Sequence, residues 1–121
     1  MSKQISFSKF GNQVLPHFRE RLSKAESTED VKKFFVYISR ELFEQLFAGK
    51  VKLNYEDIVL TPKDPPHYTM SEKLMADPGF TESWKNSDLK KIMADLAGAA
   101  LHRYIHLEKN PSKTEAKIRM R

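Results

Sequence analysis

The sequence contains no cysteine, which excludes disulfide bonds, thiol catalysis and zinc sites built from cysteine. It has only four glycines, at positions 11, 49, 79 and 98, and none of them lies in a phosphate-binding loop pattern. No apolar run approaches the roughly 18 residues that a membrane-spanning helix requires. The polar start MSKQISFSKF also lacks the apolar core of a signal peptide. From these absences we expect a cytoplasmic protein with no membrane contact.

The composition favours a folded chain with a single core. The 121 residues include eight phenylalanines, four tyrosines and one tryptophan, which argues against disorder. The net charge of +5 is unevenly placed, because residues 109–121 hold five basic side chains against one acidic side chain. The preceding residues are therefore almost neutral. We expect one helical domain over residues 1–108, followed by a basic tail over residues 109–121.

The most informative segment is the phenylalanine-rich stretch at residues 31–48. At 100° per residue, its apolar side chains form one stripe that Val36, Phe43 and Phe47 extend by roughly another 100°. The stripe itself consists of Val31, Phe35, Ile38, Leu42 and Leu46. A helix with so wide an apolar arc is either packed centrally in its own domain or shared with a partner. Burying each phenylalanine contributes roughly 1.5–3 kcal/mol, so this helix organises the fold.

Capping residues and periodicity predict three long helices. The first runs over about 13–25, after a break at Gly11 and an N-cap at Asn12, with Pro16 in its first turn. The second begins after Ser27 and ends near Gly49, where a left-handed residue is typical. The last extends from Ser87–Asp88 to about Leu107.

The central region is harder to assign. Alternating apolar residues at 50–60 suggest a small hairpin, whereas Asn54 could cap a short helix, so we expect an extended piece followed by a helical turn. The prolines at 62, 65 and 66 predict a loop. Thr69 and Glu72 fit a capping box that opens a short helix, and residues 77–79 are predicted to end it in a turn. A further turn should place Phe80 and Trp84 on one side.

These elements predict a mainly α protein, a compact bundle of four or five helices with a short extended or hairpin segment near residues 50–60. We expect a non-catalytic interaction protein, acting as a subunit, adaptor or inhibitor. It would bind another protein or itself, as a homo-oligomer, through the apolar face that includes Val36, Phe43 and Phe47. The small residues at 97–100 would let another backbone approach closely. No cofactor is expected.

One alternative is nucleic-acid binding through the first helix and the tail. The residues that would contact phosphates are Arg19, Arg21, Lys24, Lys113, Lys117, Arg119 and Arg121. Acidic residues interleave with the basic ones outside the tail, which is typical of an ordinary soluble surface. No helix-turn-helix pattern can be located.

A second alternative is a metal-dependent enzyme on the last helix. His102 and His106 are four residues apart, and Asp95 falls on the same flank, so the three could contribute ligands for zinc or iron. The HExxH pattern is absent, however, and the flank lies opposite the apolar stripe. His67 sits in the proline-rich loop with no visible catalytic partner. Little in the sequence supports catalysis.

Overall fold

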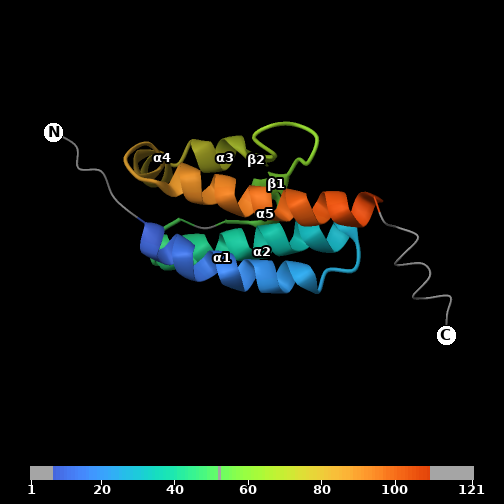
Figure 1. Cartoon of the computed structure of the whole chain (residues 1–121). Helices are drawn as coiled ribbons and strands as arrows, with labels where there is room; N and C mark the ends of the chain where they lie inside the picture. The colour runs from blue at the N-terminus through green and yellow to red at the C-terminus, as the bar shows by residue number, and fades with distance from the viewer. Residues whose placement is uncertain (1–6, 52, 110–121) are drawn as a thin grey trace.

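A computed structural model describes residues 7–51 and 53–109 (Figure 1). Its elements in chain order are α1 (Ser8–Ser23), α2 (Thr28–Phe47), the 3-10 turn η1 (Tyr55–Asp57), β1 (Ile58–Leu60), β2 (Tyr68–Met70), α3 (Glu72–Met75), α4 (Pro78–Lys85) and α5 (Leu89–Lys109). The predicted mainly α fold is confirmed. In the described ranges, five α-helices pack around one core with a single small sheet. None of these helices is both long and apolar enough to cross a membrane.

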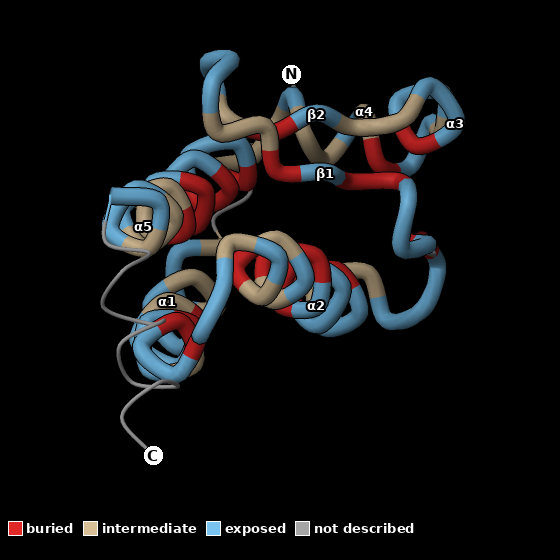
Figure 2. The backbone as a smooth tube through the Cα atoms, turned by 90° about the vertical axis from the view of Figure 1, so that its right-hand side faces the viewer, coloured by how far each residue is buried: buried red, intermediate tan, exposed pale blue. Residues whose placement is uncertain are grey.

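The three long helices pack against one another, and the strands and short helices cover one side of them (Figures 1 and 2). Helix α2 contacts α1, α5 and β1, so neighbours surround it on several sides. Helices α1 and α5 run parallel: the Phe7 amide lies at the start of α5, where it donates to Asp88 Oδ1 at 2.6 Å. At their other ends, Arg103 reaches the main chain at Ser23.

Helix α2 follows its predicted boundaries closely. The Ser27 hydroxyl accepts a hydrogen bond from the Asp30 amide, and left-handed residues at Ala48 (φ 51°) and Gly49 (φ 83°) end the helix. Val31, Phe35 and Phe43 are all fully buried. The wide apolar arc is therefore covered within a single chain, which is the first of the two outcomes that the sequence allowed.

Helix α1 begins earlier than predicted, at Ser8 instead of residue 13. Gly11 does not break the helix but lies against α5, where a Cβ atom at this position would be 3.0 Å from Ile92 Cγ1. Pro16 lies inside the helix and not in its first turn. It is exposed, so the carbonyl that loses its helical partner faces water, which limits the cost of the missing amide.

The hairpin lies further along the chain than residues 50–60. Strands β1 and β2 pair antiparallel, with Val59 opposite Thr69, and they are joined by the proline-rich loop. Asn54 is the N-cap of η1, as one reading of the sequence predicted, and Asp57 accepts from the Asn54 amide at 2.8 Å. The segment thus combines a helical turn with a strand.

Two predicted boundaries in the second half are wrong. Thr69 belongs to β2, and the short helix α3 is capped instead by Ser71, whose hydroxyl accepts from Leu74 N at 3.1 Å. Residues 77–79 do not form a terminating turn: Asp77 caps α4, whose first residue is Pro78. The ring centroids of Phe80 and Trp84 lie 5.5 Å apart, as expected from their spacing.

Helix α5 is close to its predicted range. The Ser87 hydroxyl accepts from the Leu89 amide at its start. The helix continues to Lys109, a residue that had been assigned to the basic tail. The rest of that predicted tail, residues 110–121, lies outside the described residues.

Candidate docking face on helix α5

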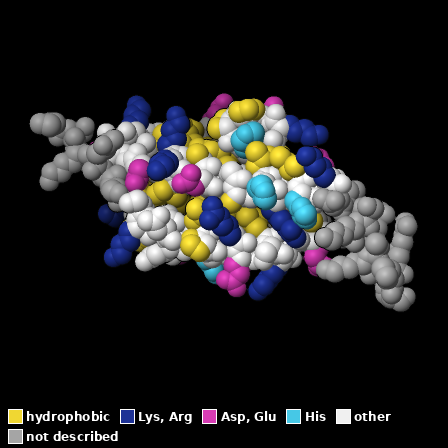
Figure 3. Space-filling model, in the orientation of Figure 1, with side chains coloured by type: hydrophobic (Ala, Val, Ile, Leu, Met, Phe, Trp, Pro, Cys, Tyr) yellow, Lys and Arg dark blue, Asp and Glu magenta, His cyan; other side chains and the backbone are white. Residues whose placement is uncertain are grey.

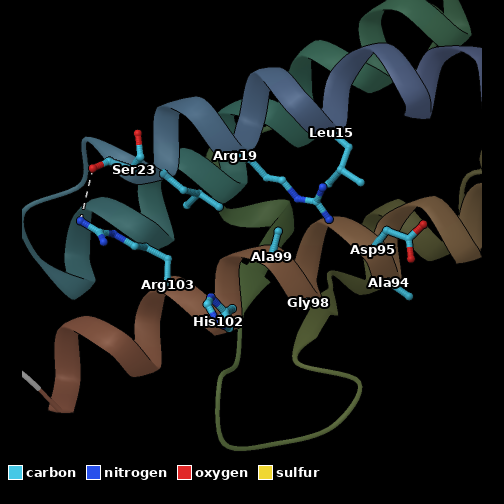
Figure 4. A pocket seen from close by; sticks show the side chains of 10 residues that line it. Leu15, Arg19, Ser23, Ala94, Asp95, Gly98, Ala99, His102 and Arg103 are labelled. Carbon is cyan, nitrogen blue, oxygen red and sulfur yellow. Dashed lines mark hydrogen bonds between the residues drawn. The ribbon is translucent and has the colours of Figure 1, made fainter.

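A groove of about 720 Å³ runs along the seam between α1 and α5 (Figure 4). Helix α1 contributes four of its lining residues and α5 contributes six. They are Leu15, Arg19, Leu22, Ser23, Ala94, Asp95, Gly98, Ala99, His102 and Arg103. Two parallel helices that are close-packed at one end thus leave an open channel along the rest of their contact.

Two glycines explain where the helices touch and where they separate. At Gly11 the backbone of α1 lies close against the Ile92 side chain, so the two helices are in tight contact there. At Gly98, in contrast, an added Cβ atom would meet nothing within 4 Å. The missing side chain at Gly98 is therefore not required by packing within this chain.

Arg103 closes the groove at the far end. Its Nη2 donates to the carbonyl oxygens of Ser23 at 3.3 Å and Ala25 at 2.8 Å, where α1 ends. Carbonyls at the end of a helix lack internal partners, so a cation there is favourable. Arg103 Nε is buried and has no hydrogen-bond partner among the described residues. This side chain fixes the spacing between the two helices at their C-terminal ends.

The groove is apolar at its floor and charged at its rim. Leu22 is buried, whereas Arg19, Asp95 and His102 are exposed. Figure 4 shows Arg19 extending from α1, with Asp95 and His102 on α5 across the groove. In the described part of the chain, Asp95 and His102 make no hydrogen bond or ion pair. They are thus available to bind an incoming group.

The outward side of α5 carries a second apolar row, which we call the α5 seam: Ala94, Gly98, Leu101 and Ile105. These residues are spaced by four, three and four, which places them on one face of a helix. Ala94 and Gly98 are exposed, Leu101 is partly exposed and Ile105 is 38% exposed. Lys91 and Glu108 continue the row at its two ends. Hydrophobic and histidine side chains lie beside one another on this face of the molecule (Figure 3).

The opposite side of α5 faces the core. Its buried residues are Leu89, Ile92, Met93, Leu96, Ala97 and Ala100. A helix that serves only its own core has one apolar side, because its outer side is solvated. Helix α5 has two, and the described residues bury only one of them. The sequence analysis does not find this outer row. It considers the small residues at 97–100 as one block and not the apolar residues that recur every three or four positions.

Two of the three residues predicted to bind a partner on α2 are buried. Val36 is 4% exposed and Phe43 is 0% exposed, so neither is available to a second protein. Phe47 is half-buried, with its ring 5.6 Å from Phe43 and 6.2 Å from Phe80. The expectation of an open face is wrong for Val36 and Phe43, which are buried. The Phe80 ring of α4 lies against Phe43 and Phe47, a contact that the sequence could not show.

The metal hypothesis is not supported by the geometry. In residues 7–51 and 53–109, no group of three or more His, Asp or Glu side chains is placed to hold an ion. Asp95 and His102 line the groove, but they do not converge with His106 into a ligand set. His67 has a positive φ of 79°, and its Nδ1 lies 3.2 Å from the Pro62 carbonyl oxygen. It is held by its own loop.

The basic residues of α1 do not form one strip. Arg19 lines the groove, whereas Arg21 and Lys24 follow it by two and five residues and so point roughly 200° and 140° away around the helix. The four tail residues of that hypothesis, Lys113, Lys117, Arg119 and Arg121, lie outside the described residues.

Comparison with known proteins adds no relative: no family model, no curated protein and no solved structure matches this chain. The functional argument therefore rests on the α5 seam and the adjoining groove.

Proposed function

We propose that this chain is a non-catalytic interaction protein that binds a helix of another chain on the outer side of α5. The observation that carries the proposal is the α5 seam, an apolar row at helical spacing that residues 7–51 and 53–109 leave exposed or partly exposed. Helix α5 is about 30 Å long, and the seam from Ala94 to Ile105 occupies roughly 16 Å of it, or about three helical turns. A helix lying along it would bury the row over several turns.

The chemistry of the row fits helix packing. Small residues at Ala94 and Gly98 permit a close approach, towards the lower end of the 8–10 Å axis separations common between helices. Leu101 and Ile105 supply larger apolar side chains, whose burial gives most of the binding free energy in complexes of this kind. The groove beside the row offers room for side chains of the incoming helix. Its charged rim can then select the partner's orientation.

This proposal retains the expected role but moves the binding surface from α2 to α5. The interior of the chain already uses Val36 and Phe43, so exposing them would require unfolding. The outer side of α5 can be covered without any such change.

Site-directed photo-crosslinking in the cells that produce the protein tests the proposal. A photoreactive residue replaces Ala94, and the matched control replaces Lys73, which is exposed on α3. We expect a discrete adduct at position 94 that Gly98→Leu in the same chain abolishes, and none at position 73. Equal or absent labelling at the two positions would contradict a specific docking face.

A further inference from the structure

We infer that the occupant of this face is a second copy of the chain, whose α5 packs antiparallel against the first across a twofold axis. The inference rests on the proposed function and specifies its partner. Its basis is that, when two copies of α5 lie antiparallel, the α5 seam of one is complementary to that of the other in both shape and charge.

The complementarity in shape follows from the order of residues along the seam. The small residues, Ala94 and Gly98, come first, and the large ones, Leu101 and Ile105, come second. In an antiparallel pair that is centred between Gly98 and Leu101, Gly98 faces Leu101 of the second copy and Ala94 faces Ile105 of the second copy. Each small residue thus receives a large one, and the twofold axis repeats both contacts.

The charged residues at the ends of the row also pair favourably in this antiparallel register. The next layer outward places Lys91 opposite Glu108 of the second copy, and both side chains are exposed. The positions beside the seam bring Asp95 next to His102 of the second copy, which is the flanking pair that antiparallel helices form. The Lys91–Glu108 contact joins opposite charges, and the imidazole N–H of His102 can donate a hydrogen bond to the Asp95 carboxylate. The axis produces each of them twice.

A parallel pair would lose these contacts. It would place Gly98 on Gly98 and Ile105 on Ile105, leaving a gap at one level and crowding at another. It would also set Lys91 against Lys91 and Glu108 against Glu108, which repel. The sequence of the exposed row therefore favours the antiparallel arrangement over the parallel one.

Cysteine crosslinking with the purified full chain tests the register directly, because the protein has no native cysteine. Two single variants, Ala94→Cys and Ile105→Cys, are oxidised separately and as an equal mixture. We expect a crosslinked dimer in the mixture that joins one variant to the other, and little in either sample alone. Equivalent positions in an antiparallel pair would lie about 16 Å apart, too far for a disulfide.

Other crosslinking results would overturn the inference. Strong dimers within each single variant would indicate a parallel pair. No crosslinking in any sample would exclude this contact between copies. A mixture of Ala94→Cys with Lys73→Cys on α3 serves as the control for random collision, and it should give no more product than either variant alone.

Sedimentation of charge variants tests whether the pairs set the register. Lys91→Glu and Glu108→Lys each create two like-charge contacts, so we expect each to raise the dimer dissociation constant about tenfold. The double variant restores opposite charges and should return the constant to within about threefold of the original. If the double variant remains as weak as the single ones, the proposed pairing is wrong.

The two proposals fail in different ways. A purified chain that stays monomeric at high concentration overturns self-pairing. If position 94 nevertheless gives a photo-adduct whose mass exceeds the chain by that of a different protein, the docking face remains valid and its partner is heterologous. An adduct of twice the chain mass supports both.

Discussion

At the scale of single residues, Asp57 is a buried side chain whose carboxylate accepts two hydrogen bonds. It is 4% exposed, and its carboxylate accepts from the Asn54 amide at 2.8 Å and from the Ser71 hydroxyl at 2.7 Å. Its main-chain carbonyl oxygen also accepts from the Ser71 amide at 2.8 Å. One buried residue thus joins η1 to the end of the hairpin.

Replacing this residue should destabilise the protein clearly. We expect Asp57→Ala to lower the free energy of unfolding by about 2–3 kcal/mol, because two donors lose a charged acceptor inside the protein. Urea unfolding followed by circular dichroism measures the loss. Asp57→Asn keeps the shape and one acceptor oxygen, so its loss should be smaller. An Asp57→Ala variant as stable as the original chain would contradict a role for the carboxylate bonds.

The burial of Tyr68 should make the free energy of unfolding sensitive to alkaline pH. Burial raises the pKa of its phenol above the ordinary value of 10.0. The folded state therefore favours the neutral phenol. The resulting stability is fully present below the unfolded pKa and is lost as the pH rises through the folded one. As the pH rises above about 10, the unfolding free energy of Tyr68→Phe should fall less than that of the original chain. Parallel curves would contradict this.

Capping shows which residues could be read from sequence alone. Ser27 was predicted correctly because its hydrogen bond to the Asp30 amide depends only on neighbours in the chain. Thr69 was predicted as a cap and is instead a strand residue, since its pairing with Val59 comes from ten residues away. A hydrogen bond between neighbours in the chain can be predicted from the sequence, whereas pairing with a distant strand cannot and can replace the predicted cap.

Between elements, the two glycines of the α1–α5 contact should respond in opposite ways to the same change. Gly98→Ala should raise monomer stability by roughly 0.5–1 kcal/mol, since alanine favours a helix and the added carbon meets nothing. Gly11→Ala should give no gain or a loss of about 1 kcal/mol, because its Cβ would press on Ile92. Thermal unfolding at low protein concentration measures both. A stabilised Gly11→Ala would show that the contact is looser than the structure indicates.

Sequence periodicity located α2 and α5 almost to the residue, because both have a long apolar repeat with a cap in front. It failed at the start of α1, because it predicts a break at Gly11 and puts Pro16 in the first turn. Gly11 instead packs on α5 from within the helix, and Pro16 is an exposed residue of the helix interior. It also did not find the α5 seam. The width of an apolar arc says how much surface must be covered but not which element covers it. In α2, contacts come from α1, α5 and β1, and from Phe80 of α4 against Phe43 and Phe47.

At the scale of the whole molecule, one aromatic cluster connects two helices that are far apart in the sequence, α2 and α4. Phe43 stacks on Phe80 at 5.3 Å, and Phe80 in turn lies 5.5 Å from Trp84, so α2 and α4 share a single packed unit. The rest of the core is continuous with it. Such a chain has no part that could unfold while the other part keeps its own core.

Unfolding should therefore be cooperative. Trp84 is the only tryptophan, so its fluorescence reports on the aromatic cluster, while circular dichroism reports on all the helices. We expect the two signals to give the same urea midpoint. Phe43→Ala should shift both midpoints together, with a loss of about 3–5 kcal/mol. A fluorescence change that precedes the loss of helix would contradict a single cooperative core.

The parallel pairing of α1 with α5 also affects how the chain is made. The Phe7 amide and Asp88, which meet at the start of the two helices, are separated by 81 residues. At about 5–20 residues per second, a ribosome needs roughly 4–16 s to add that many. During this interval the apolar side of α1 has emerged without its permanent neighbour, so newborn chains depend on α2, or on chaperones, to keep that side covered until α5 has been synthesised.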